Sequence, residues 1–197
     1  MNTRTFLSSI NNVDYDSFKN EFIKQNLSES EKQNLLVAIL ENGYNHKQFS
    51  FYKRVFDLVI DSRLNLNFTV PDHFATHFLS LVILYAPNTE LFDYFITNGA
   101  KINFHKKDDE DDEFETCLDF AEKHLSDSLS DNMQIYYYKT WNDYSTIDNE
   151  KASIDKKDYQ QLIDQSAHLF GIKNTYTLIN HIIATGGKRY CELNKKQ

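Results

Sequence analysis

Apolar residues recur along the first forty positions with the spacing of amphipathic helices. They return at intervals of three and four residues around Phe18, and again around Leu36. Ser28 precedes Glu31 by three positions, which is the capping-box pair that satisfies free backbone N–H groups where a helix begins. The pattern therefore predicts two amphipathic helices, the second beginning at Ser28.

Three further helices are expected from the same periodicity, over about residues 51–62, 74–85 and 89–98. Pro87 separates the last two, because proline cannot continue a helix. Only 5 Gly and 2 Pro occur in the 197 residues, too few for the many tight turns of an all-β sandwich. We therefore expect an all-α fold.

Two segments share a pattern of apolar helix end, turn and extended tail closing on asparagine. They are residues 58–67 and 94–103, and their closing residues Asn67 and Asn103 lie 36 positions apart. Residues 176–188 again end an amphipathic helix in a glycine turn. Self-similarity at a fixed period predicts stacked helix–turn–helix repeats.

The second of these segments resembles the ankyrin consensus ending L-L-x-x-G-A-D-V-N, with Gly99 and Ala100 in place and Lys101 where Asp is usual. Residues 116–121 are similar to the ankyrin helix opening T-P-L-H/D-x-A, with Cys in place of Pro. The resemblance covers about residues 33–190, although most repeats lack this opening. It implies an ankyrin-like helical-repeat solenoid that binds another protein. HEAT-like and other helical repeats remain alternatives.

The expected organisation is a single helical-repeat domain over residues 1–197. Residues 1–32 form N-terminal capping helices, and residues 33–190 form degenerate repeats with an insertion near residues 123–160. Residues 191–197 form a tail. Stacked repeats bury one another's apolar faces and leave an extended surface, which suits a macromolecular partner.

Charge narrows the class of partner. The formal net charge of −8 repels nucleic-acid phosphates and anionic lipid, and it favours encounter with a basic protein. The longest apolar run, residues 78–86, is shorter than the roughly 20 residues of a membrane span. Cys117 and Cys191 form no C-x-x-C pattern, and no secretory leader is visible. We expect a cytoplasmic protein, monomeric when free, that binds neither nucleic acid nor membrane and needs no cofactor.

An acidic segment, residues 108–115, is the first candidate contact with such a partner. Its seven carboxylates belong to Asp108, Asp109, Glu110, Asp111, Asp112, Glu113 and Glu115. A charge block of this kind either forms a solvated loop or presents a dense negative field to a basic surface, which raises the association rate. A calcium loop of the EF-hand type is disfavoured, because it needs a central glycine and none occurs here.

The aromatic residues 136–144 are a second candidate contact. They contain the only Trp of the chain, and the candidate partner-binding side chains are Tyr137, Trp141 and Tyr144. Tyrosine and tryptophan dominate interface hot spots, but rings on a helix also enter the core. Core and interface are equally compatible with this segment.

The sequence contains only parts of two motifs that are typical of enzymes, a pair of metal-binding histidines and a phosphate-binding glycine loop. His73 and His77 have the i, i+4 spacing of metal ligands on a helix, but Phe74 stands where a metalloprotease has glutamate. Structural histidines at a helix start are the preferred interpretation, with a metal-dependent hydrolase as the alternative. The residues Gly186-Gly187-Lys188 follow a predicted helix and not a strand, so they predict a helix end and not a phosphate loop. We do not expect an enzyme.

The functional prediction is a protein-binding inhibitor that occludes a basic partner. Its sharper form is a bacterial immunity protein that neutralises a cognate toxin such as a nuclease, because nucleases carry positive charge to bind phosphates. The Asn-, Lys-, Ile- and Tyr-rich composition resembles that of small proteins encoded beside secreted toxins in AT-rich bacterial genomes. A scaffold or regulatory subunit that does not inhibit its partner is the alternative binding role.

Overall fold

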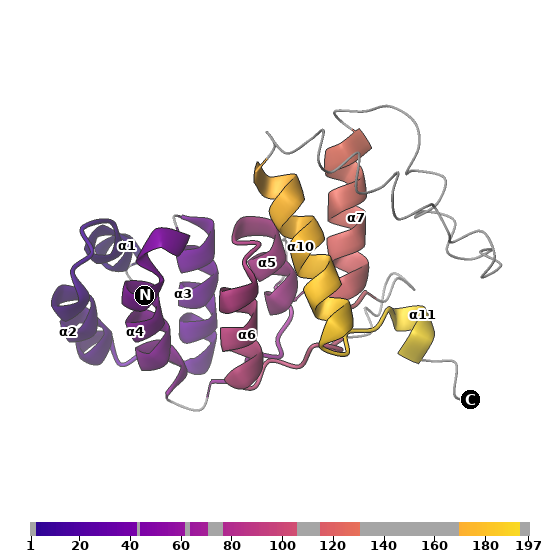
Figure 1. Ribbon diagram of the computed structural model, residues 1–197. Coiled ribbons are helices and arrows are strands. Elements are labelled where there is room, and N and C mark those ends of the chain that lie inside the picture. Colours follow the sequence, from indigo (N-terminus) through magenta and orange to yellow (C-terminus); the bar gives the residue numbers. More distant parts are fainter. Residues whose placement is uncertain are drawn as a thin grey trace, which may run out of the picture. The chain divides into compact units, whose positions relative to one another are not determined.

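A computed structural model describes residues 3–42, 44–61, 64–70, 77–105, 115–130 and 170–193, and the chain in these ranges is mainly helical (Figure 1). The helices are α1 (Thr3–Asn11), α2 (Tyr15–Gln25), α3 (Glu29–Glu41), the 3-10 turn η1 (His46–Gln48), α4 (Phe49–Ile60), α5 (Phe78–Tyr85), α6 (Thr89–Thr97), α7 (Cys117–Ser130), α10 (Phe170–Ala184) and α11 (Tyr190–Leu193). Within these ranges the only β interaction is an isolated antiparallel bridge between Thr69 and His77. The all-α prediction is confirmed for the described part of the chain.

The chain divides into two compact units. The first comprises residues 1–86 and 90–101, and the second comprises residues 87–89 and 102–197. No helix in the described ranges is long and apolar enough to cross a membrane.

Side-chain caps explain where the early helices begin. The Ser28 backbone N–H donates to Glu31 Oε2 at 3.0 Å, and the Glu31 N–H donates to Ser28 Oγ at 3.3 Å. The bond from the Ser28 N–H favours the charged carboxylate and is the first cause of a Glu31 pKa lowered to about 2. The start of α3 predicted at Ser28 is confirmed. Asp14 caps α2 in the same way, accepting from the Ser17 N–H at 3.0 Å.

Helices of the first unit contact one another in two series. In one series α3 contacts both α1 and α5, and in the other α4 contacts α2. Phe56 of α4 and Phe95 of α6 extend the second series, with ring centroids 5.2 Å apart. In the successive pairs α1/α2, α3/α4 and α5/α6, the first helix of each pair therefore packs on the first helix of the next. The second helix packs in the same way on the second helix of the next pair.

Aromatic rings fill the contact between α4 and α6. Phe56 is fully buried, and its ring lies 6.0 Å from that of Tyr94 and 5.2 Å from that of Phe95. The Tyr94 hydroxyl donates to Asp57 Oδ1 at 2.8 Å, and Lys53 forms an ion pair with the other oxygen of Asp57 at 3.0 Å. The polar end of the tyrosine thus reaches a partner while its ring remains in the core.

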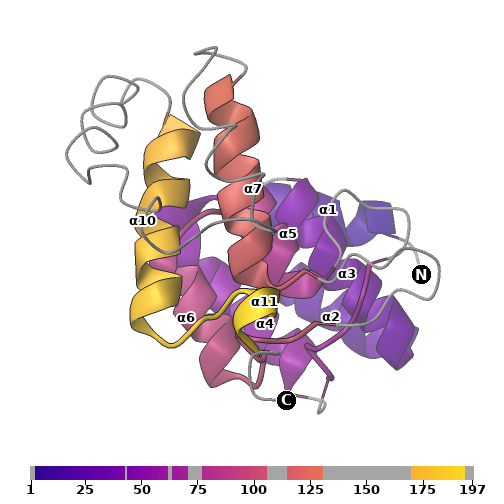
Figure 2. The same cartoon turned by 90° about the vertical axis from the view of Figure 1, so that its right-hand side faces the viewer.

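In the second unit α7 packs on α10, and the two lie side by side in both views (Figures 1 and 2). Both helices carry buried apolar side chains: Leu118, Ala121 and Leu125 on α7, and Leu178, Ile179 and Ile182 on α10. Apolar residues spaced three and four positions apart place each set on one helix face.

Three element boundaries differ from those expected from the sequence. The helix predicted over residues 74–85 begins at Phe78, because His77 is extended, with φ −150° and ψ 168°. Residues 123–130, expected to start the insertion, continue α7. Part of the expected C-terminal tail is the short helix α11.

Candidate interaction site

Two glycines end the second helix of a pair in the same way. Gly99 has φ +103° and Gly186 has φ +95°, a conformation that a residue without Cβ adopts at little cost. The residue after each glycine donates its N–H to the carbonyl five positions back, at 3.0 Å from Ala100 and 2.8 Å from Gly187. This bond pattern is the Schellman motif of helix ends, and it directs the chain away from the helix axis.

An asparagine side chain binds the first glycine turn. Asn67 Nδ2 donates to the Gly99 carbonyl at 3.1 Å, and the Lys101 N–H donates to Asn67 Oδ1 at 2.7 Å. A carboxamide fits both sites because it carries a donor and an acceptor side by side. We call this pair of hydrogen bonds the Asn67 bridge.

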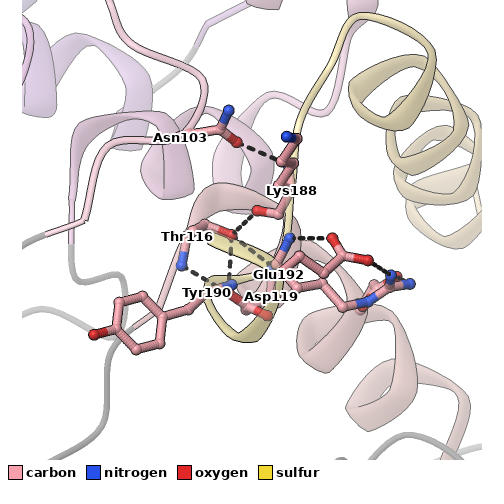
Figure 3. A network of polar contacts seen from close by, with 8 residues as sticks. Asn103, Thr116, Asp119, Lys188, Tyr190 and Glu192 are labelled. Carbon is pink, nitrogen blue, oxygen red and sulfur yellow. Dashed lines mark hydrogen bonds and ion pairs between the residues drawn. The ribbon is translucent and has the colours of Figure 1, made fainter. Parts of the chain in front are cut away.

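The second glycine turn has an equivalent bridge from Asn103. Asn103 Nδ2 donates to the Gly186 carbonyl at 3.2 Å. The Lys188 N–H donates to Asn103 Oδ1 at 2.7 Å (Figure 3). Atoms and distances thus match those of the Asn67 bridge closely. The asparagines that the sequence placed 36 positions apart therefore have the same structural role.

The backbone N–H of Asn65 corresponds to those of Lys101 and Lys188, but its hydrogen-bond acceptor is not an asparagine. Asn65 precedes Asn67 by the same two positions that separate Lys101 from Asn103. The Asn65 N–H donates to Glu29 Oε1 at 3.2 Å, so a carboxylate of α3 takes the place of the asparagine acceptor.

Both flanks of the acidic segment are bonded to Lys188. Asn103 binds the Lys188 N–H, as described above, and Thr116 Oγ1 lies 2.8 Å from the Lys188 carbonyl oxygen (Figure 3). Thr116 is fully buried, and its own N–H donates to Asp119 Oδ2 at 2.9 Å. Buried polar groups of this kind are costly to leave unpaired, so these bonds hold the start of α7 in place. The 12 residues between Asn103 and Thr116 therefore leave from and return to one backbone position.

The same network extends to the turn before α11. Asp119 Oδ2 also accepts the Tyr190 N–H, at 2.9 Å. Arg189 binds the buried Glu122 through two contacts, Nε to Oε2 at 2.8 Å and Nη2 to Oε1 at 2.5 Å. These groups bond one another, so the network links α7 to the turn that precedes α11.

Of the predicted contact residues, the structure describes Glu115, which is half-buried next to Thr116. The other candidates lie outside the described residues: Asp108, Asp109, Glu110, Asp111, Asp112, Glu113, Tyr137, Trp141 and Tyr144. Their roles stay predictions.

The structure describes one of the two histidines considered as metal ligands. His77 is 2% exposed and immediately precedes α5, with Ser80 Oγ 3.2 Å from its Nε2. It is not within a helix, so the helical i, i+4 geometry does not apply to it. His73 lies outside the described residues, and among those described no three His, Cys, Asp or Glu residues are grouped to hold a metal ion.

The two cysteines are expected to differ strongly in reactivity. Cys117 is fully buried and its thiol donates to the Ile102 carbonyl at 3.1 Å, whereas Cys191 is exposed. Burial, with the charge of Asp119, raises the pKa of Cys117 to about 12, so little thiolate forms near neutral pH. Maleimide labelling followed by mass spectrometry should modify Cys191 first. The control is Cys191→Ser, which should label only in denaturant; prompt labelling of this variant in buffer would contradict the burial of Cys117.

The contacts that organise this site were only partly visible in the sequence. The recurrence of Asn67 and Asn103, together with the glycine turns at residues 99–101 and 186–188, was the available indication of the two bridges. The pairing of Arg189 with Glu122 joins residues 67 positions apart and had no indication in the sequence. Comparisons of the chain with protein-family models, curated proteins and solved structures found no match.

Proposed function

We propose that this protein is a binding inhibitor that occludes a basic protein partner through its acidic segment, residues 108–115. The observation that carries the proposal is the attachment of both flanks of that segment to Lys188, through Asn103 and Thr116. Fixing both ends of a loop restricts the positions that its charges can occupy, and it lowers the entropy cost of ordering them against a partner.

The distribution of charge supports a local role for this segment. It holds 7 of the 29 acidic residues, and the remaining 22 nearly balance the 21 Lys and Arg residues. Almost all of the net charge of −8 is therefore concentrated in eight positions. A concentrated field steers an oppositely charged protein toward one orientation, which a uniformly acidic surface does not do.

The helical scaffold is proposed to be an ankyrin-like repeat solenoid. Three observations support this assignment: helix pairs that contact in two series, glycine turns at Gly99 and Gly186, and equivalent bridges from Asn67 and Asn103. Repeats of this kind use extended surfaces to bind macromolecules. The long segment between α7 and α10 departs from a regular repeat, since the two helices of each earlier pair are joined by a short connection.

In its sharper form, the proposal is an immunity protein that neutralises a cognate toxin, a nuclease being the favoured class. A nuclease must carry positive charge to bind phosphates, so an acidic protein segment can cover its substrate-binding surface. The protein would then act in the cytoplasm, bind as a monomer and require no cofactor.

The test is capture of partners from the source organism by the tagged full chain at low and high salt, followed by an activity assay of the captured protein. The proposal expects a basic partner, weaker capture at high salt and loss of partner activity when this protein is added. A captured partner with unchanged activity would instead indicate a scaffold. Recovery of only acidic partners would exclude the proposal.

The two asparagine bridges provide a matched pair of variants for the role of the loop flanks. Asn103→Ala removes two hydrogen bonds at one flank of the acidic segment, whereas Asn67→Ala removes two equivalent bonds elsewhere. Each should lower the free energy of unfolding by about 1–2 kcal/mol, measured by urea denaturation. Only Asn103→Ala should also slow association with the captured partner, by a few fold in stopped-flow kinetics. Equal effects of both variants on association would show that the bridge acts through stability alone.

A further inference from the structure

His105 stands between the Asn103 bridge and the acidic segment, and its half-buried side chain is held from two sides. Its Nδ1 lies 3.1 Å from the Asn103 carbonyl oxygen, and because a carbonyl only accepts, Nδ1 carries the proton of this bond. Its ring forms an edge-to-face contact with the ring of Tyr190, with centroids 5.0 Å apart and planes at 68°. Such pairs attract each other beyond the effect of burial. One backbone contact and one ring contact therefore orient the imidazole.

Tyr190 is in turn fixed to the opposite flank of the acidic segment. Its N–H donates to Asp119 Oδ2 at 2.9 Å, and the same oxygen accepts the Thr116 N–H at 2.9 Å (Figure 3). The ring of Tyr190 thus contacts the flank before the segment, and its backbone shares an acceptor with the flank after it. This connection uses different groups from the one through Lys188, two positions earlier in the chain.

The ring contact shortens the chain between the last fixed side chain and the first carboxylate of the segment. Asp108 follows His105 by three positions and Asn103 by five. Since a fully extended chain spans at most about 3.6 Å per residue, the Cα atom of Asp108 stays within about 11 Å of that of His105. With Asn103 as the last fixed residue, the limit would be about 18 Å. Holding His105 therefore confines the start of the segment to a smaller volume.

We propose that Tyr190 is a positioning residue of the binding site: its ring holds His105 and so sets where the acidic segment leaves the helical scaffold. The inference rests on the proposed function for the role of the segment, but the contact itself can be tested without a partner. An edge-to-face pair is strong enough to favour the held position of His105 about 2- to 12-fold over a released one. Loss of the ring should therefore release this flank, while the hydrogen bond from the Tyr190 N–H remains.

Lys-specific proteolysis of the full chain under native conditions measures the release, because a protease must hold several residues on each side of the cut bond in extended form. Lys106 and Lys107 directly follow His105, and Lys47 in the first unit is an exposed reference site. Tyr190→Ala should speed cleavage after Lys106 or Lys107 about threefold or more and leave cleavage after Lys47 unchanged. Tyr190→Phe keeps the ring and should be cleaved at the parent rate.

His105→Ala removes the same contact from the other side. It should give a similar acceleration, and the double variant with Tyr190→Ala should add little to either single change. The matched control is His124→Ala, which loses another ring contact of the same unit, with Phe120 at 5.9 Å, and should leave cleavage after Lys106 at the parent rate. If Tyr190→Ala lacks a cooperative thermal transition, His105→Ala takes its place in the test.

Unchanged cleavage after Lys106 and Lys107 would overturn the positioning role, as would equal acceleration at Lys47, which indicates general loosening. Cleavage of Tyr190→Phe at the rate of Tyr190→Ala would overturn it too, since the hydroxyl and not the ring would then hold the flank. Stopped-flow association with the captured basic partner tests the proposed function separately. If Tyr190→Ala speeds cleavage but leaves association unchanged, the positioning role stands and the acidic segment is not the contact with that partner.

Discussion

Reversing two charges of the acidic segment, in Asp111→Lys/Asp112→Lys, is expected to slow association with the basic partner about tenfold or more at low ionic strength. The physical reason is the loss of the local attractive field that steers the encounter. Stopped-flow association rates measured over a series of salt concentrations would show a smaller salt dependence for the variant than for the parent chain.

The matched control is Asp16→Lys/Asp61→Lys, which changes the net charge by the same four units at two exposed positions of the first unit. Its association rate should change by less than about threefold, because it leaves the concentrated field in place. Equal slowing by both variants would show that net charge, and not the acidic segment, controls the encounter. Unchanged rates in both would remove the segment from the interface.

Arg189→Met is expected to lower the free energy of unfolding by about 2–4 kcal/mol. The substitution leaves the Glu122 carboxylate buried without its guanidinium partner, and the range allows for the partial exposure of Arg189. Urea denaturation of the full chain, followed by circular dichroism, measures the loss.

Lys188→Met is the control for this variant, because it removes the neighbouring exposed charge and keeps the backbone bonds to Asn103 and Thr116. It should change stability by no more than about 0.5 kcal/mol. A loss below about 1 kcal/mol for Arg189→Met would show that the Glu122–Arg189 pair contributes little to the second unit.

The helical class and several helix boundaries were predictable because they depend on local interactions. The capping pair Ser28 and Glu31, and the glycine turn at Gly99, involve groups within a few positions of each other. Capping helices were expected over residues 1–32, but the bounds of α1 were not predicted, because its two largest buried side chains, Phe6 and Ile10, make only a short apolar pattern. This helix is stabilised by contacts with α2 and α3 that a local pattern does not reveal.

At the start of α5, in contrast, the sequence pattern predicted helix where the structure has extended backbone, at His77. Helical periodicity placed His77 inside a helix, but its extended backbone takes part in the bridge with Thr69, and the Phe78 N–H donates to the Phe68 carbonyl at 3.2 Å. The competing hydrogen bonds come from residues before the helix. The tertiary structure brings the backbone of Phe68 and Thr69 next to His77 and Phe78. The periodicity of apolar side chains does not encode this contact.

By itself, the sequence determined the helical class, the glycine turns, the recurrence of Asn67 and Asn103, and the concentration of charge in residues 108–115. Each follows from composition or from interactions between close neighbours in the chain. Only the tertiary structure decided that Lys188 binds both flanks of the acidic segment and that Arg189 pairs with Glu122. Those bonds join residues 67 to 85 positions apart, so they form only when packing of α7 on α10 brings distant backbone and side-chain groups together.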